Sequence, residues 1–450
     1  MKNSLLGATF LLLAGCAVLD PHDIVSRRIG NAAPHDGAAL SAAQRQDAFD
    51  FVWQRIKDNY VDPALRGVDW QGVGARYRPL AMAAAGDDAF WHTLDNMTGE
   101  LGDSHTRVMS SKQYGYFHQR QVLSLGLGVR QIEGELLVTG VAAGSEAGLA
   151  GIRAGNKLLS IDGVPAQLWW QDKRAKARRQ STAHATAASV ARVLNSGDPD
   201  QPGERVTLTL ERNDHSVLAV TLLRAPLDAK DSVKAVRLAS GYGYLRLSGF
   251  GHDAQLHAAT DAAFDAIRST KGMLLDLRGN GGGSTAFADA LASKWLSKPS
   301  AAGRVATRDG KPVSLLFIPI GNRLEHTIAG TPNAYRAPLV ILIDASSASA
   351  SELLASSLQG LGRAKVVGET SCGCLQTYFG YTNVPGGGAL AYSEMDFFAA
   401  NGKRIEGVGV LPDVEVGPSR HDLQIGRDAQ LEAALALLDT LTAAAPTKEQ

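Results

Sequence analysis

The stretch Ser347-Ala348-Ser349-Ala350-Ser351-Glu352 separates an apolar strand pattern, Leu339 to Ile343, from an apolar helix pattern, Leu353 to Leu358. A sharp turn from a strand into a helix exposes a serine hydroxyl and places backbone N–H groups of the helix start beside it. This geometry suits a nucleophile, with Ser349 as the attacking residue. The alternative is that Ser349 only caps the helix and Glu352 completes a capping box. The rest of the chain favours the nucleophile.

The composition is ordinary for a soluble globular protein. The chain has 450 residues, of which 45% are hydrophobic and 20% are charged. This length exceeds a single hydrophobic core and predicts about two to four domains. The formal net charge is zero at pH 7, which gives no support for a nucleic-acid partner.

The N-terminus has the pattern of a lipoprotein signal peptide. Lys2 precedes an apolar segment from Leu5 to Leu13, which ends in Leu13-Ala14-Gly15-Cys16. Because a spanning helix needs about 20 apolar residues, this segment predicts a signal peptide over residues 1–15. The final tetrad looks like a bacterial lipobox, which implies lipidation of Cys16; an uncleaved signal or a coincidental cysteine is the alternative. Residues 16–40 are predicted to be a tether.

Two cysteines remain if Cys16 carries lipid. Cys372 and Cys374 are separated by one glycine. We expect this spacing to be too tight for a comfortable disulfide. No histidine lies nearby to complete a zinc site, so the sequence predicts neither a metal nor a cofactor.

The hydrophobic pattern predicts a multidomain α+β fold. Phe49, Val52, Ile56 and Tyr60 repeat at helical spacing, short alternating strands come next, and strands that alternate with helices form the last part. That last part predicts an α/β core with a largely buried sheet. The predicted divisions are a helical N-terminal domain at 41–118, a β-rich domain at 119–226 with a helical insertion, an α/β core at 227–440 and a tail at 441–450.

The β-rich part resembles a PDZ domain. The resemblance lies in Gly126-Leu127-Gly128-Val129, Ser145 to Leu149 and Gly155 to Gly163. It implies that an extended peptide binds as an added strand and that backbone N–H groups near Gly126, Leu127, Gly128 and Val129 hold its terminal carboxylate. A β-rich linker domain without a ligand is the alternative.

Three further stretches, together with Ser347 to Glu352, resemble the serine peptidase superfamily of C-terminal processing peptidases and the tricorn protease. They are Gly102-Asp103-Ser104-His105-Thr106, Leu274 to Gly283, and Glu406 to Asp413. The resemblance runs from about residue 45 to residue 417, nearly the whole mature chain.

The base that activates the serine differs between branches of that superfamily. Processing peptidases carry a lysine where this chain has Cys374, within Gly368-Glu369-Thr370-Ser371-Cys372-Gly373-Cys374. The tricorn-like branch uses histidine, and imidazole is well suited to accept a serine proton near neutral pH. The resemblance therefore assigns Ser349 as nucleophile and His105 as base, with Ser104 and Glu406 completing a tetrad. A surface-loop histidine and a solvated carboxylate are the alternatives.

Acyl transfer also needs N–H donors for the developing oxyanion. The candidates are the backbone N–H groups of Ala350 and of Gly281 or Gly282, because glycine lets the backbone approach a substrate closely. Asp276 and Arg278 are expected to order this loop. A phosphate-binding loop is not indicated, because no Gly-Lys-Ser/Thr follows the glycines.

The sequence thus predicts a lipid-anchored serine endopeptidase that acts on polypeptides of the cell envelope. Ala17 after the lipidated cysteine favours the outer membrane, facing the periplasm, as the resemblance implies. A non-catalytic peptide-binding scaffold and a small-ester hydrolase are the alternatives. Two hypotheses apply to Cys372 and Cys374. Their thiols line the active-site cleft and their oxidation modulates activity, or they are two small buried residues without a redox role. The oligomeric state stays open.

Overall fold

The computed structural model describes residue 27 and residues 39–119, 121–196, 205–228, 231–315, 318–319 and 324–444. The predicted signal peptide, Cys16 and most of the predicted tether lie outside the described residues. Among the residues described, no helix is both long and apolar enough to cross a membrane.

Two compact units make up the chain, and each is assembled from separate stretches of sequence. The first contains residues up to Gly115 together with Ala301–Thr327 and Gln376–Arg404. The second contains Tyr116–Ser300, Ile328–Leu375 and Ile405–Gln450. The predicted domains are continuous stretches of sequence. The first unit differs from them, because two later stretches of sequence pack with the N-terminal residues.

The first unit has a helical core, as predicted from the spacing of its apolar residues. Ser41 begins the first long helix with a capping box to Gln44, and Phe49, Val52 and Ile56 on that helix are buried. A three-stranded antiparallel sheet, β1-β20-β19, packs its Val108, Leu390 and Val384 into the same core. The elements are α3 (Ala42–Asn59), η1 (Leu65–Gly67), α4 (Trp70–Met82), α5 (Asp87–Gly99), β1 (Arg107–Met109), α6 (Ser111–Gln119), β13 (Ser300–Thr307), β14 (Ser314–Leu315), β15 (Ile318–Pro319), β16 (Glu325–Ile328), β19 (Thr382–Val384), β20 (Gly388–Ala391) and β21 (Met395–Ala399).

The first half of the second unit is β-rich. Its sheet has the strand order β3-β4-β5-β7-β8, with β6 paired to β5, and Val190 and Leu194 of α9 pack against its buried face. The two helices α8 and α9 account for the predicted helical insertion. The elements are β2 (Gln121–Ser124), β3 (Leu127–Ile132), β4 (Glu135–Val141), α7 (Glu146–Leu149), β5 (Lys157–Ile161), β6 (Val164–Pro165), α8 (Ala166–Lys176), α9 (Ala183–Ser196), β7 (Arg205–Glu211), β8 (Val217–Leu223) and β9 (Ala225–Asp228).

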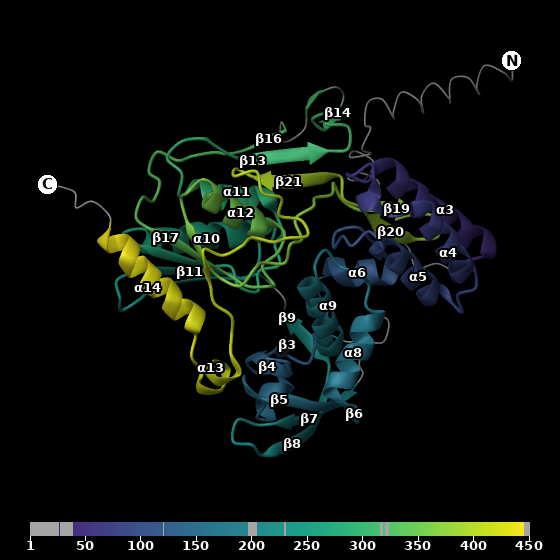
Figure 1. Ribbon diagram of the computed structural model, residues 1–450, viewed down its shortest axis with the longest axis horizontal. Coiled ribbons are helices and arrows are strands. Elements are labelled where there is room, and N and C mark those ends of the chain that lie inside the picture. The colour runs from purple at the N-terminus through teal and green to yellow at the C-terminus, as the bar shows by residue number, and fades with distance from the viewer. Residues whose placement is uncertain are drawn as a thin grey trace. The chain divides into compact units, whose positions relative to one another are not determined.

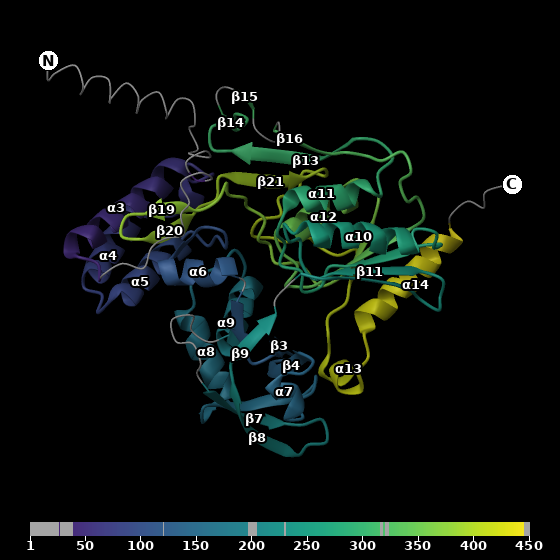
Figure 2. The same cartoon turned by 180° about the vertical axis from the view of Figure 1, so that it is seen from behind.

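The second half of this unit is the α/β core. Its six-stranded sheet has the order β10-β11-β12-β17-β18-β22, and all pairs except β10-β11 are parallel. Helices α10, α11 and α12 lie on one face and α14 lies on the other (Figure 1; Figure 2 from behind). The elements are β10 (Val233–Arg237), β11 (Gly243–Leu247), α10 (Ala254–Ile267), β12 (Met273–Asp276), α11 (Thr285–Ser293), β17 (Leu339–Ile343), α12 (Ala350–Gly360), β18 (Lys365–Gly368), β22 (Val414–Glu415), α13 (Arg420–Ile425) and α14 (Ala429–Ala443).

The central strands explain the position of the predicted nucleophile. Every residue of β12 and β17 is buried, which the continuous apolar runs of both strands require. Parallel strands end at the same edge of a sheet, so the loops after β12 and β17 lie next to one another. The glycine-rich loop and the serine turn are therefore neighbours.

Candidate active site

Ser349 lies at the sharp turn between β17 and α12 and is partly exposed. Its φ is +56° and its ψ is −118°, a backbone conformation that non-glycine residues rarely adopt. The Ser349 N–H donates to the Glu352 carboxylate at 3.0 Å and to the carbonyl oxygen of Cys374 at 3.1 Å. The Ser349 backbone therefore has the contacts expected of a helix cap, which is the alternative interpretation of this residue. The Ser349 residue is nevertheless partly exposed.

The loop after β12 contacts one side of the turn from Ser347 to Ala350. This turn is called the nucleophile turn after the predicted role of Ser349. Ser347 donates its hydroxyl proton to the carbonyl oxygen of Leu277 at 2.8 Å, and the Ala348 N–H donates to the carbonyl oxygen of Asn280 at 3.0 Å. A Cβ atom on Gly282 would lie 2.7 Å from the Ser349 Cβ and 2.8 Å from the Ala350 nitrogen. Position 282 therefore requires glycine, because any side chain would displace Ser349.

The candidate oxyanion donors differ in whether their N–H groups already have an acceptor. The Gly282 N–H donates to the Asn280 side chain at 2.9 Å, so it is already engaged. Within the described part of the chain, the N–H groups of Ala350 and Gly281 have no acceptor. Ala350 and Gly281 are thus the better supported donors, and Gly282 supplies close backbone approach.

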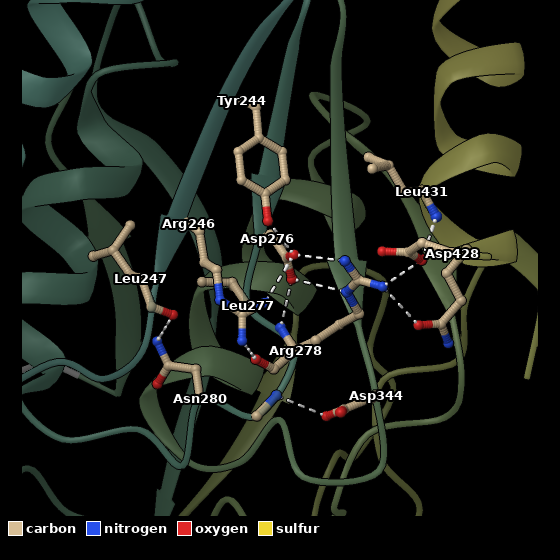
Figure 3. Close-up of polar contacts among 12 residues, drawn as sticks. Tyr244, Arg246, Leu247, Asp276, Leu277, Arg278, Asn280, Asp344, Asp428 and Leu431 are labelled. Atoms are coloured by element: carbon tan, nitrogen blue, oxygen red, sulfur yellow. Dashed lines mark hydrogen bonds and ion pairs between the residues drawn. The ribbon is translucent and has the colours of Figure 1, made fainter. Parts of the chain in front are cut away.

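A buried ionic network orders the glycine-rich loop (Figure 3). Asp276 is fully buried and accepts hydrogen bonds from Tyr244, Arg246 and Arg278, at 2.7, 3.0 and 2.7 Å to its Oδ2 atom. Burial would raise the pKa of Asp276, but Arg278 and Arg246 lower it below its ordinary value. Asp344, at the end of β17, accepts the Gly279 N–H at 3.0 Å. These contacts agree with the expectation that Asp276 and Arg278 order the loop.

Glu352 is the most buried carboxylate of the nucleophile turn, with no exposed surface. Besides the Ser349 N–H, it accepts hydrogen bonds from the Ser371 hydroxyl at 2.6 Å and from the N–H groups of Gly373 and Cys374 at 2.7 and 2.9 Å. Burial raises the pKa of Glu352 to about 7, against the opposing effect of these donors. Glu352 therefore links the turn to the segment after β18.

Glu406 belongs to the same unit as Ser349. It is 1% exposed, and its Oε2 atom accepts the Leu375 N–H at 2.9 Å. The next residue, Gly407, donates its N–H to the carbonyl oxygen of Gly373 at 2.8 Å. The segment from Ser371 to Leu375 thus contacts both the nucleophile turn and the predicted tetrad carboxylate, so Glu406 is not a solvated surface residue.

Ser104 and His105 lie in the first unit, in the loop between α5 and β1. Buried Asp103 orders this loop: it accepts the His105 N–H at 2.8 Å and the hydroxyl protons of Thr106 and Ser393 at 2.5 and 2.6 Å. Burial would raise the pKa of Asp103, but His105 and these hydroxyl groups lower it below its ordinary value. Both Ser104 and His105 remain partly exposed, and the His105 ring lies 5.9 Å from that of Tyr378.

The expectation that Cys372 and Cys374 are too close for a disulfide is wrong. The two residues are bonded to one another, with Cα atoms 5.2 Å apart. The positive φ of Gly373, +71°, folds the intervening backbone back on itself and brings the two side chains to the same side. This is a local backbone geometry that residue spacing alone does not reveal.

Sequence reasoning also missed Ser371, which donates to Glu352 and accepts the Val410 N–H at 2.6 Å. The signal was available in Gly368-Glu369-Thr370-Ser371-Cys372-Gly373-Cys374, where the resemblance drew attention only to the missing lysine. The predicted peptide-binding residues Gly126 to Val129 lie at the start of β3, where the Leu127 N–H donates to the Asn195 side chain at 3.0 Å. A ligand carboxylate at that N–H would have to displace Asn195.

The chain is similar to known serine peptidases. Residues 241–416 match the profile of peptidase family S41, and residues 41–99 match that of the tricorn protease C1 domain. The chain is 27% identical to carboxyl-terminal-processing peptidase 3 of Arabidopsis thaliana chloroplasts, over 81% of this chain and 67% of the relative. It is 26% identical to the carboxyl-terminal-processing protease of Synechocystis, over 89% of this chain and 88% of the relative.

The fold has solved counterparts as well. The photosystem II D1 C-terminal processing protease superimposes with a TM-score of 0.56 at 21% identity, over 90% of this chain and 99% of that structure. At this identity the likeness speaks for the fold, and the chemistry rests on the residues described above.

Proposed function

Because this chain is a serine peptidase of family S41, we propose that it is an endopeptidase whose nucleophile is Ser349 and whose general base is His105. The observation that carries this proposal is the turn at Ser349. The serine is partly exposed and has a positive φ, and the N–H groups of Ala350 and of Gly281 in the neighbouring loop have no acceptor among the described residues. That combination serves attack on a carbonyl carbon and binding of the resulting oxyanion.

The proposed reaction has two halves. The Ser349 Oγ atom attacks the peptide carbonyl carbon while the His105 imidazole accepts the hydroxyl proton, and the N–H groups of Ala350 and Gly281 bind the oxyanion. The tetrahedral intermediate collapses to an acyl-enzyme when the imidazolium gives its proton to the leaving amine. Water, deprotonated by the same imidazole, then releases the second product. Ser104 and Glu406 orient and stabilise His105 in this scheme.

A serine–lysine pair is not available at the position where processing peptidases carry the lysine. Position 374 is a cysteine whose sulfur atom is bonded to Cys372, and the sequence has no lysine between Lys365 and Lys403. A disulfide sulfur atom has no proton to exchange and is not a general base. This favours the histidine of the Asp-Ser-His loop.

Substrate engagement and location are finer parts of the proposal. We propose that the β-rich half of the second unit is a PDZ domain that binds the substrate's C-terminal segment at Gly126 to Val129. The processing peptidases named above support this, because their names describe action at carboxyl termini. We also propose a lipid anchor at Cys16 and envelope polypeptides as substrates, on the basis of the signal-peptide pattern.

Mapping of a fluorophosphonate probe tests the central claim. The purified full chain is treated with the probe, and the modified residue is found by mass spectrometry in the wild type, Ser349→Ala and His105→Ala. We expect labelling of Ser349 in the wild type and its loss in both variants. Arg427→Ala, which removes the two ion pairs of a half-exposed arginine with Asp422 and Glu432, is the matched control and should label like the wild type.

No labelling of folded wild type, under conditions where a known serine peptidase reacts, would contradict the proposal and favour a non-catalytic binding protein. Labelling that persists in His105→Ala would show that another group activates Ser349. Competition between peptides and small esters for the labelled site separates a peptidase from an ester hydrolase.

A further inference from the structure

The Cys372–Cys374 disulfide closes a small ring in the segment after β18. Both cysteines are buried, and Gly373 forms the middle of the ring. A Cβ atom on Gly373 would lie 2.7 Å from the Thr182 side chain and 3.1 Å from the nitrogens of Val408 and Gly409. The ring is therefore enclosed on several sides and has little room to move.

The backbone of this ring contacts the nucleophile turn. The carbonyl oxygen of Cys374 accepts the Ser349 N–H at 3.1 Å, and the Cys372 N–H donates to the carbonyl oxygen of Ser347 at 2.9 Å. The Gly373 and Cys374 N–H groups donate to the Glu352 carboxylate, which also accepts the Ser349 N–H. Direct and carboxylate-mediated contacts thus connect the ring to the nucleophile's own backbone.

The ring also contacts the region of Glu406. The carbonyl oxygen of Gly373 accepts the Gly407 N–H at 2.8 Å, and the Leu375 N–H, one residue beyond the ring, donates to the Glu406 carboxylate at 2.9 Å. A displacement of the ring would therefore disturb hydrogen bonds to both Ser349 and Glu406. The described residues contain no other disulfide bond.

We propose that the Cys372–Cys374 disulfide is a positioning element of the nucleophile turn, so that peptidase activity depends on the redox state of this pair. This inference rests on the proposed function. Without the bond, a short segment with glycine at its centre has many more backbone conformations, and its N–H groups face a buried carboxylate that needs them. The bond holds those donors in place.

The redox step needs a two-electron donor such as a dithiol. The dithiol supplies two electrons and two protons, the bond between the Cys372 and Cys374 sulfur atoms breaks, and two thiols form. The dithiol becomes a cyclic disulfide in the same exchange. Reoxidation reverses these changes, so the effect on activity is expected to be reversible.

The rate of fluorophosphonate labelling at Ser349 is the measurement. It is compared for the oxidised full chain, the dithiothreitol-reduced chain, the reoxidised chain and the Cys372→Ser/Cys374→Ser variant, with thiol content checked by intact mass. We expect labelling about 10- to 100-fold slower after reduction and in the variant, a size typical of a displaced oxyanion or nucleophile geometry. Reoxidation should restore the wild-type rate, and dithiothreitol should leave the variant unchanged.

Two further readouts separate positioning from general stability. Peptide cleavage should lose kcat while KM stays within about twofold, because the ring contacts the backbone of Ser349. The near-UV circular dichroism spectrum should be retained after reduction. Equal labelling rates in all samples would overturn the inference, and so would unfolding on reduction, which would assign the bond to global stability. Absence of labelling in the oxidised wild type would instead refute the proposed function.

Discussion

Ser349 is held in a backbone conformation that few non-glycine residues adopt. Its φ of +56° is maintained by contacts on both sides, from the loop after β12 and from the segment after β18. Such a conformation costs about 1–3 kcal/mol and persists only where the surroundings enforce it. The surroundings here are buried hydrogen bonds, so single substitutions next to the turn should affect activity strongly.

Gly282→Ala tests this at the residue scale. The added Cβ would meet the Ala348 carbonyl oxygen and the Ser349 Cβ at 2.7 Å, and the residue has a φ of +94°. We expect kcat/KM for peptide cleavage to fall by about 100-fold, the size of losing one oxyanion donor. Gly281→Ala is the comparison, because a Cβ there meets nothing within 4 Å and the N–H is retained. An equal loss in both variants would contradict the steric argument.

Glu352→Gln tests the pH dependence of stability. The pKa of Glu352 is raised to about 7 in the folded chain from an ordinary 4.5, so between those values the folded state binds more protons than the unfolded state. The free energy of unfolding should then fall as the pH rises from about 4.5 to 7, by up to about 3 kcal/mol. Denaturant titrations across this range measure the slope, and Glu352→Gln should remove it. The same slope in wild type and variant would assign it to other groups.

At the scale of elements, two loops of the α/β core meet because their strands are adjacent. The loop after β12 is held by the buried Asp276 network, and the turn after β17 leads into α12. The parallel pairing of β12 with β17 places Asp276 opposite Leu342. The relative position of the two loops therefore depends on sheet register as well as on the residues of each loop.

Asp276→Asn should destabilise the core. The change leaves Arg278, which is 15% exposed, and Arg246, which is 40% exposed, facing a neutral side chain. This costs about 2 kcal/mol after allowance for solvent screening and loosens the loop that carries Gly281. Since the pKa of Asp276 is lowered, its contribution is present above an ordinary pKa of 3.8 and is lost as the pH falls through the folded value. Urea unfolding at pH 7 measures the loss. Asp422→Asn, whose Arg427 partner is half-exposed, should lose much less stability, because solvent screens that pair.

Asn195→Ala tests the proposed PDZ site. Its side chain occupies the Leu127 N–H, which the PDZ resemblance assigns to a ligand carboxylate. Removing this internal acceptor should strengthen binding of a peptide with a free C-terminal carboxylate by about 5- to 10-fold, the worth of one such hydrogen bond. Fluorescence anisotropy with free-acid and amidated peptides measures the change. If both peptides bind alike, or neither binds, the segment is not a carboxylate site.

At the scale of the whole molecule, each unit combines stretches that are distant in sequence. Ala301–Thr327 and Gln376–Arg404 belong with the N-terminal helices, so the chain passes between units several times. Ser104 and His105 belong to the first unit, and Ser349 and Glu406 belong to the second.

Cys16→Ser tests the proposed anchor. Acyl chains add about 0.8 kcal/mol of membrane binding for each buried CH₂ group, so loss of lipidation should move the chain from the membrane fraction to the aqueous fraction. Ultracentrifugation and labelling with a palmitate analogue measure this. Peptide cleavage by the released chain should be unchanged, because the proposed catalytic residues begin at Ser104. Membrane association that survives the substitution would refute a lipid anchor at this position.

Several elements could be predicted from sequence because their signals are local. Short alternating strands are expected after the N-terminal helical region, and the structure has them, for example at Lys157–Ile161, Arg205–Glu211 and Val217–Leu223. Alternation of apolar and polar residues, with turn residues at each end, specifies a strand that is buried on one face. The serine turn was predictable for the same reason, since a continuous apolar strand and an apolar helix flank it.

The sequence by itself determined the order of the helical, β-rich and α/β regions, the serine turn and the family, because periodicity, turn chemistry and short motifs act over neighbouring residues. Only the tertiary structure decided three further features. Gly373 brings Cys372 and Cys374 into a disulfide, Glu352 becomes fully buried beneath four donors, and two late stretches join the N-terminal unit. Each depends on backbone direction or on contacts between residues far apart in the chain, which residue spacing does not encode.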